Sequence, residues 1–259
     1  MKIVRYWDSA SNRPRYGVIK GDMVHEIDGE PYGELKLTNA SRPLSGLRLL
    51  APCEPTKIVA GGANYHGHLK EVGLPVPKVP VFFLKPPTAL IGPDDAVVYP
   101  PETRQLEYEG ELAVVVKNRM RNTPAKDVLR NLLGYTCAND VTARDIQVQG
   151  GNLLHLCHSK SFDTFCPVGP WIETELDAHA IDIELRINGE VRQRKSNTSD
   201  MIFPVEEMVS YFSHVMTLLP GDLILTGAPP GIGGMKAGDN VEVVIQGIGT
   251  LRHTVITKT

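Results

Sequence analysis

The sequence predicts a mainly β fold with a few helices, which belongs to the α+β class, and three observations support this. Short runs rich in β-branched and aromatic residues recur along the chain, separated by glycine, proline and asparagine. Only two segments carry clear start and stop signals of helices. Strands and helices also do not alternate regularly, as they would in a protein built on a parallel sheet.

The first fifty residues are expected to form a small β-domain, residues 1–50. Its predicted strands are Lys2–Trp7, Tyr16–Lys20 and Met23–Ile27. Polar turns separate these strands. The prolines that follow, Pro43, Pro52 and Pro55, indicate a boundary near residue 50, so that residues 51–259 form one larger domain.

Strands dominate the larger domain as well. The predicted strands, in chain order, are Lys57–Ala60, Val81–Lys85, Ala96–Tyr99, Leu106–Val116, Tyr135–Val141, Ile181–Ile187, Asp222–Thr226, Asn240–Gln246 and Thr250–Thr257. Asn188-Gly189 stands between two extended segments and predicts a hairpin with a two-residue turn.

Two helices are predicted in this domain. The first is capped by Thr123, has Pro124 at its first position and ends before Gly134. The second begins at Pro204 and carries apolar residues at helical spacing, namely Val205, Met208, Val209, Phe212 and Val215.

The composition excludes several classes of protein. With 27 Lys and Arg against 30 Asp and Glu, the net charge of −3 offers no cationic surface for nucleic acid. No apolar run approaches the ~18 residues that span a bilayer, and the chain turns polar too early for a secretion signal. The four cysteines form no C-x-x-C pair. We therefore expect a cytoplasmic protein with reduced thiols that binds neither nucleic acid nor membrane.

The most informative segment is the predicted strand Leu106–Val116. Alternate residues of a strand share one face, so Glu107, Glu109 and Glu111 would point the same way. Three such carboxylates repel one another unless a cation lies between them. Carboxylate oxygens without a nearby His or Cys favour Mg²⁺ or Mn²⁺. A solvent-facing acidic edge strand is an equally good interpretation of this segment alone.

Two further segments carry candidate functional residues. After the strand Tyr135–Val141, Asp140 could complete a carboxylate set, and Arg144 could hold an anionic group of a substrate. An ordinary Asp–Arg surface pair is the simpler interpretation of these two residues. Lys160 stands among aromatic and apolar neighbours that could partly desolvate it, although an exposed lysine would fit as well.

The segment around His66 and His68 could bind a metal or act as a base. The H-x-H pattern is found on metal-binding strands, but Glu71 follows His68 too closely for that pattern. On a helical turn, His68 and Glu71 instead share one side, where the carboxylate can orient the imidazole. This is the arrangement of a general base with its orienting group, and a loop histidine beside a solvated glutamate is the alternative.

Taken together, these segments resemble the fumarylacetoacetate hydrolase family, from about Lys57 to Val255. The residues that carry the resemblance stand in the family's order: Asn64-Tyr65 with His68 and Glu71, Phe83-Leu84-Lys85-Pro86, Tyr108-Glu109-Gly110-Glu111-Leu112, Asn139-Asp140 with Ala143-Arg144-Asp145-Ile146-Gln147, Lys160-Ser161-Phe162-Asp163, Pro167-Val168-Gly169-Pro170-Trp171, and Pro220-Gly221-Asp222 with Thr226-Gly227. Each piece is weak alone, but the ordered set is specific.

The resemblance implies a twisted β-roll core in the catalytic domain, residues 51–259, preceded by the small N-terminal β-domain, and a homodimer. It implies that the metal, Mg²⁺ or alternatively Mn²⁺, is bound by Glu109, Glu111 and Asp140, which leaves Glu107 as a neighbour. Three carboxylates and a divalent ion would leave one negative charge, which Lys160 neutralises.

The resemblance also implies the other site residues. Lys160, Arg144 and Gln147 would hold oxygens of the substrate, with Lys160 part of the catalytic set, and Asn64, Tyr65 and Thr226 would contribute to substrate binding. His68 and Glu71 would form the catalytic pair on a lid.

The sequence departs from the family in two segments. The usual Thr-Gly-Thr-Pro becomes Thr226-Gly227-Ala228-Pro229, so that one hydroxyl is missing. The segment Gly150–Ser159 is less basic and more apolar than is common there.

The function implied is that of a Mg²⁺-dependent hydrolase that cleaves a C–C bond in an acylpyruvate, a 2,4-dioxo acid, in aromatic or 2-oxo acid catabolism. His68 would activate water, and pyruvate would leave as its enolate. Decarboxylation of an oxaloacetate-like acid and isomerisation of a 2-hydroxyhepta-2,4-diene-1,7-dioate-like substrate share this enolate and are the alternatives. A catalytically silent metal-binding protein is the remote alternative.

Overall fold

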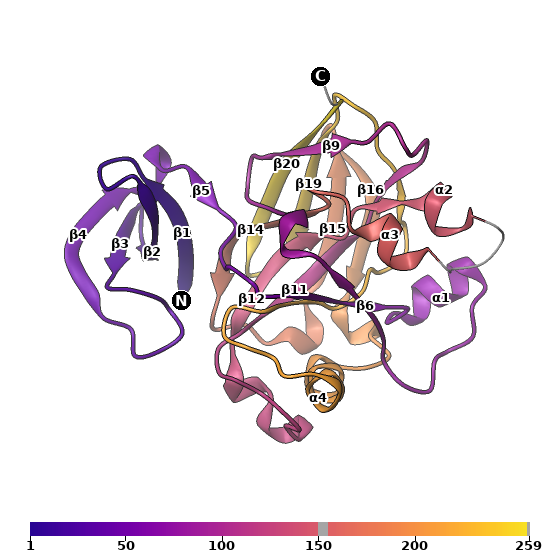
Figure 1. The fold of residues 1–259 in the computed structure, drawn as a ribbon, viewed down its shortest axis with the longest axis horizontal. Helices are drawn as coiled ribbons and strands as arrows, with labels where there is room; N and C mark the ends of the chain where they lie inside the picture. The colour runs from indigo at the N-terminus through magenta and orange to yellow at the C-terminus, as the bar shows by residue number, and fades with distance from the viewer. Residues whose placement is uncertain (150–154, 258–259) are drawn as a thin grey trace.

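The computed structural model describes residues 1–149 and 155–257, most of which form strands and loops. Figure 1 shows a smaller lobe made of the N-terminal strands beside a larger lobe that contains the helices. The expected fold class, mainly β with a few helices, is confirmed. Within the described ranges, no helix has both the length and the apolar character needed to cross a membrane.

The largest sheet extends through both lobes. Its strands run in the order β4 (Leu37–Pro43), β3 (Met23–Ile27), β2 (Arg13–Lys20), β1 (Lys2–Asp8), β14 (Cys166–Glu173), β12 (Leu132–Asn139), β11 (Gly110–Val116), β17 (Leu223–Leu225), β6 (Ile58–Gly62) and β7 (Val81–Lys85), with β5 (Leu49–Leu50) beside β1 and β8 (Leu90–Ile91) beside β14. The lobes join where β1 pairs with β14, at Lys2 opposite Glu173 and Ile3 opposite Ile172.

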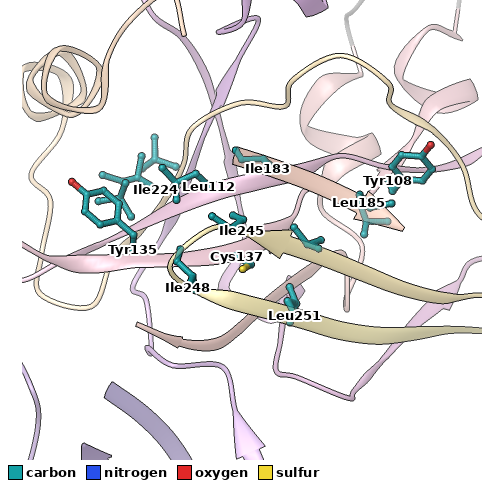
Figure 2. Packing of buried hydrophobic residues seen from close by; sticks show 14 of the residues in the cluster. Tyr108, Leu112, Tyr135, Cys137, Ile183, Leu185, Ile224, Ile245, Ile248 and Leu251 are labelled. Carbon is teal, nitrogen blue, oxygen red and sulfur yellow. The ribbon is translucent and has the colours of Figure 1, made fainter. Parts of the chain in front are cut away.

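A second sheet packs against the middle of the first. Its order is β16 (Glu190–Asn197), β15 (Asp182–Ile187), β19 (Asn240–Ile245), β20 (Gly249–Thr257) and β9 (Ala96–Tyr99). Figure 2 shows Leu112 and Ile224 of the first sheet close to Ile183 and Ile245 of the second, and all four side chains are buried. Strand β11 is buried along its whole length. Leu112, Val114 and Val116 belong to the cluster that includes Ile183 and Ile245, whereas Ala113 and Val115 belong to a second apolar cluster.

The predicted strand Leu106–Val116 is divided in two. Leu106–Tyr108 forms β10, which pairs with β13 (Thr142–Ala143) and β18 (Gly233–Gly234) in a small third sheet. Gly110–Val116 forms β11 of the largest sheet. Glu109 therefore lies where the chain passes from one sheet to another, and the alternation of faces along a single strand does not extend across it.

The described helices are α1 (His66–Val72), α2 (Arg144–Gln147), α3 (Leu156–Lys160) and α4 (Val205–Val215). The helix predicted after Pro204 is confirmed as α4. The helix predicted from Thr123 to Leu133 is wrong: two short 3-10 turns, Ala125–Asp127 and Leu129–Asn131, occupy this segment. The last residues of the segment belong to a strand, because Leu132 begins β12 and pairs with Val116. Pairing with the sheet thus overrides a good local helix signal.

Candidate metal centre and substrate cavity

Three carboxylates converge at the junction between the sheets. Glu109, Glu111 and Asp140 each offer an oxygen, and these oxygens lie within 4.8 Å of one another. The strand register explains this, because Gly110 of β11 pairs with Asn139 of β12 and the Asp140 amide donates to the Glu109 carbonyl at 2.9 Å. Residues just before one strand and just after its antiparallel partner are thereby brought side by side.

Three buried or half-buried cations surround these carboxylates. The Lys160 ammonium lies 2.8 Å from Glu109 Oε2 and 2.6 Å from Asp140 Oδ2. Lys85 Nζ lies 2.5 Å from Asp140 Oδ1 on the other side. Arg144 donates to Glu109 Oε1 through Nη2 and to Glu107 Oε2 through Nε at 2.7 Å. All three cations thus bind the carboxylate cluster.

The surroundings shift the ionisation of two of the carboxyl groups in opposite directions. Burial by itself would raise the pKa of Glu109, but the Lys160 ammonium and the Arg144 guanidinium hold it at about 2. Burial raises the pKa of Glu111 well above its ordinary value, and repulsion from Asp140 and Glu109 adds to this. Glu111 is therefore the member of the cluster that most needs a further positive charge in order to ionise.

The residues present fit a hard divalent cation. Every donor in the cluster is a carboxylate oxygen, the ligand that Mg²⁺ and Mn²⁺ prefer. Glu111 Oε2 accepts from the Gly227 amide at 2.7 Å, whereas Glu111 Oε1 is buried without a hydrogen-bond partner among the described residues. A buried acceptor in this state is costly unless a donor or a cation meets it.

Two charged members of this site, Lys85 and Glu107, have no role that the sequence predicts. Lys85 stood in a segment that carried the family resemblance, and Glu107 was set aside as a neighbour, yet they bind Asp140 and Arg144 respectively. With both included and every carboxyl group ionised, four carboxylates (Glu107, Glu109, Glu111 and Asp140) face three cations (Lys85, Lys160 and Arg144), so one negative charge remains. A divalent ion would change this to one positive charge. The charge balance expected from Lys160 alone is therefore wrong, because Lys85, Arg144 and Glu107 also contribute to it.

A cavity of about 420 Å³ opens onto the cluster. Glu109, Asp140, Arg144, Gln147 and Lys160 form its polar end, and apolar side chains from β7 and from the chain around the three short helices form the rest of its wall. Figure 1 shows α1, α2 and α3 gathered on one side of the larger lobe. Gln147 Oε1 accepts a hydrogen bond from Arg144 Nη1, which joins it to the charged network.

His68 lines this cavity from α1, so the structure brings it to the same chamber as the carboxylates. Its Nδ1 lies 3.7 Å from Glu71 Oε2, one helical turn away, and makes no hydrogen bond to a described residue. Glu71 Oε2 instead accepts from the Gly231 amide at 3.0 Å. The helical turn expected for this pair is confirmed, while a direct hydrogen bond within it is not formed.

Three residues expected to bind substrate lie outside the cavity lining. Asn64 donates to the carbonyls of Thr226 and Phe203 and accepts from the Phe203 amide. Thr226 Oγ1 donates to the Leu112 carbonyl at 2.8 Å. Tyr65 is fully buried, and its hydroxyl has no hydrogen-bond partner among the described residues. A contact of any of the three with substrate stays a prediction, and for Asn64 and Thr226 it would require present hydrogen bonds to break.

The two departures from the family pattern lie partly within this site. Ala228 and Leu156 both line the cavity. Of the segment Gly150–Ser159, residues 150–154 lie outside the described residues, and Leu156 comes from the described part. Both departures therefore add apolar surface to the wall.

Comparison with known proteins matches family models to most of the chain. The model described as fumarylacetoacetate (FAA) hydrolase, C-terminal, matches residues 57–256. A second, described as Rv2993c-like, N-terminal, matches residues 1–52.

Individual relatives carry different enzyme names. The chain is 42% identical over 225 residues to the mitochondrial oxaloacetate tautomerase FAHD2A of Bos taurus, covering 83% of this chain and 71% of that protein. It is similar over its whole length to the structure of 5-carboxymethyl-2-hydroxymuconate delta-isomerase from Mycobacterium smegmatis, with 40% identity, a TM-score of 0.92 and full coverage of both chains. A maleylpyruvate hydrolase structure from Sphingobium has 31% identity and a TM-score of 0.81, again covering both chains fully.

Proposed function

This chain belongs to the fumarylacetoacetate hydrolase family, whose members are enzymes, and on that premise we propose that it is a Mg²⁺-dependent hydrolase of acylpyruvates. The reaction is cleavage of the C3–C4 bond of a 2,4-dioxo acid by water, which yields pyruvate and a carboxylic acid. One observation carries the proposal: two members of the three-carboxylate cluster, Glu109 and Asp140, line the same cavity as His68. We assign the activity to the cytoplasm and to the breakdown of aromatic compounds or 2-oxo acids.

In this proposal Glu109, Glu111 and Asp140 hold the ion, with Mn²⁺ as the alternative to Mg²⁺. The ion would supply Lewis-acid stabilisation of the negative charge that develops on the substrate's 2-oxo oxygen. Arg144 uses one N–H of each of its three nitrogens in the bonds described above, so two hydrogens of its guanidinium remain for the 1-carboxylate of the substrate. Lys160, buried beside Glu109 and Asp140, adds positive charge where the enolate forms.

His68 is proposed as the general base. A proton on Nδ1 would face Glu71 and leave Nε2 free to take a proton from water. The resulting hydroxide adds to C4, the C3–C4 bond breaks, and its electron pair leaves with pyruvate as the enolate, which is then protonated at C3. The distance of 3.7 Å between His68 Nδ1 and Glu71 Oε2 would shorten when substrate binds, as catalytic hydrogen bonds often do.

Keto–enol tautomerisation of an oxaloacetate-like 2-oxo acid is the second candidate. The name of the Bos taurus relative supports it, and the reaction needs the same enolate but no water. Isomerisation and decarboxylation use that enolate as well. These alternatives differ from the first proposal in their products, because hydrolysis of an acylpyruvate releases pyruvate together with a second acid.

The test is pyruvate release from acylpyruvates, measured with and without Mg²⁺, alongside loss of enol absorbance from oxaloacetate. Mg²⁺-dependent pyruvate release supports hydrolysis. Rapid enol–keto exchange of oxaloacetate without any pyruvate release from acylpyruvates would support the tautomerase instead.

A matched pair of variants tests the ligand assignment. Glu109→Gln removes a proposed ligand charge and keeps the side chain's size, so calorimetric titration should show Mg²⁺ binding lost or weakened by at least about tenfold. Glu107→Gln, two residues away, removes the charge of a carboxylate that binds Arg144 and Gln105 and is not a proposed ligand, so it should leave most of the Mg²⁺ affinity intact. Normal Mg²⁺ binding in Glu109→Gln, with loss in Glu107→Gln, would refute the assignment.

A further inference from the structure

The cavity has two chemically different ends, and this difference bears on which acids can enter it. At the polar end, the cluster and its cations would carry one net positive charge with a divalent ion bound, as counted above. A single substrate carboxylate balances that charge, and a second one would leave an excess of negative charge. The polar end thus matches a monocarboxylate.

The remainder of the wall is apolar. Apart from Ala63, Ala228 and Ile232, its apolar side chains come from three parts of the chain: Val72 and Leu74 at the end of α1, Val81 and Phe83 on β7, and Val148 and Leu156 around α2 and α3. Val72, Leu74, Val81 and Val148 are each more than 40% exposed. Apolar side chains that gather around a cavity while remaining exposed indicate a surface that a ligand covers.

No free cation stands on this wall among the described lining residues. Arg144 and Lys160 are bound to the carboxylates at the polar end. The one other described lining side chain that can carry a positive charge is His68, whose Nδ1 lies 3.7 Å from Glu71. His158 of α3 does not line the cavity, and its ring packs on Phe162 with centroids 5.6 Å apart. Residues 150–154 read GGNLL and contain no ionisable side chain.

We infer that the enzyme selects 2-oxo acids whose far end is an uncharged, apolar chain, and that it discriminates against dicarboxylates of the same length. This inference rests on the proposed function for the reacting end of the substrate. It sets the chain apart from its named structural neighbours, whose titles refer to a carboxymethyl-hydroxymuconate isomerase and a maleylpyruvate hydrolase. The physical reason is that a carboxylate placed against this wall loses its hydration without gaining a partner.

The first experiment compares two substrates that differ only at the far end. These are 2,4-dioxooctanoate, which ends in a methyl group, and 2,4-dioxooctanedioate, which ends in a carboxylate. Cleavage would release pyruvate with pentanoate or with glutarate, and a lactate dehydrogenase assay follows pyruvate in both cases. We expect kcat/KM to favour the monocarboxylate on the order of 10²-fold, since an unpaired charge must be desolvated in the other.

The second experiment measures binding without any reaction. The ligands are 2-oxooctanoate and 2-oxooctanedioate, which lack the 4-oxo group. Isothermal titration calorimetry of the Mg²⁺-loaded protein gives the dissociation constant of each acid and so measures the preference of the cavity alone. We expect 2-oxooctanoate to bind more tightly, again by roughly 10²-fold.

A variant can weaken the preference. Val148→Arg places a cation on the apolar wall at a side chain that is 46% exposed, where arginine can be accommodated. The preference for the monocarboxylate should fall by about tenfold or more, because the guanidinium can pair with the distal carboxylate. Val191→Arg, at a valine of β16 that is 48% exposed and outside the cavity lining, is the control and should leave the preference unchanged.

The outcomes separate the inference from the proposed function. Tighter binding of 2-oxooctanoate without cleavage of either dioxo acid would support the inference and overturn the hydrolase. Equal or better binding of the dicarboxylate would overturn the inference, whatever the activity. If neither 2-oxo acid bound to the Mg²⁺-loaded protein, this result would contradict both the inference and the proposed function.

Discussion

Asn139 and His253 form a buried pair next to the carboxylate cluster. Asn139 Oδ1 accepts from the Glu109 amide at 2.9 Å, so its amide nitrogen must point to His253 Nε2, also 2.9 Å away. That nitrogen of His253 must therefore accept, which requires a neutral ring. Burial agrees with this, since it lowers the pKa of His253 to about 4.

The neutral state of His253 makes stability depend on pH. In the unfolded chain the ring takes up a proton near pH 6.5, whereas in the folded protein it does so only near its pKa of about 4. The stabilisation is therefore present above about pH 6.5 and is lost as the pH falls from there towards 4. Between pH 8 and pH 5 we expect a loss of about 2 kcal/mol in the free energy of unfolding from this group.

Urea unfolding of the parent and of His253→Gln at both pH values checks this. Glutamine can still accept from Asn139 but does not titrate, so the variant should lose about 2 kcal/mol less between pH 8 and pH 5 than the parent does. Equal losses in the two proteins would contradict a neutral His253.

His68 provides the second prediction at this scale. If it is the base, His68→Ala should reduce the rate of C–C cleavage by roughly 10²–10⁴ and leave Mg²⁺ affinity unchanged, because the proposed ligands are all carboxylates. His66→Ala is the control, since His66 is exposed and outside the cavity lining, and it should do much less. Loss of Mg²⁺ binding in both variants, measured by calorimetry, would restore the H-x-H pattern as a metal site.

At the scale of elements, the turn after β17 supports the metal centre. The Gly227 amide donates to Glu111 Oε2, and the residue has φ of +93°. A Cβ at this position would lie 3.0 Å from Asn64 Cβ. Both the left-handed backbone and the close approach of Asn64 require glycine here.

Gly227→Ala should therefore lower the free energy of unfolding by more than the backbone strain alone would. Gly238 is the matched control, since it has φ of +92° and nothing within 4 Å of an added Cβ. Gly238→Ala should lower the free energy of unfolding by about 1–2 kcal/mol, and Gly227→Ala by a further 1–3 kcal/mol, roughly, from overpacking. Only Gly227→Ala should also weaken Mg²⁺ binding. If the two substitutions had equal effects on the free energy of unfolding and on Mg²⁺ binding, the contact with Asn64 would be relaxed at little cost.

At the scale of the whole molecule, the smaller lobe is attached to the larger one through the pairing of β1 with β14. The Arg5 guanidinium, which forms an ion pair with Glu54, adds a contact beyond the strands. We propose residues 1–50 and 51–259 as the two domains, as expected from the sequence.

The homodimer, which the family resemblance implies, is the prediction for the whole molecule. Sedimentation equilibrium of the 28.4 kDa chain should give twice that mass at micromolar concentration. A mass of one chain that does not change with concentration would count against it.

Local pattern in the sequence was sufficient for most strands and for α4. Apolar runs bounded by turn residues predicted strands such as Val81–Lys85, which appears with the same bounds as β7. Start and stop residues alone could not predict the outcome at Thr123–Leu133, because Leu132 and Leu133 are held by β12 in the sheet. The resemblance to the family supplied the order of Glu109, Glu111, Asp140, Arg144 and Lys160 along the chain.

Tertiary structure decided how those residues meet. The change of sheet at Glu109 and the register of β11 with β12 bring Asp140 beside Glu109, although they are far apart in sequence. Lys85 reaches Asp140, and Glu107 reaches Arg144, through contacts that no sequence spacing specifies. The physical reason is that period and propensity act over a few residues, whereas the charge balance of a buried site depends on every ionised group that folding encloses with it.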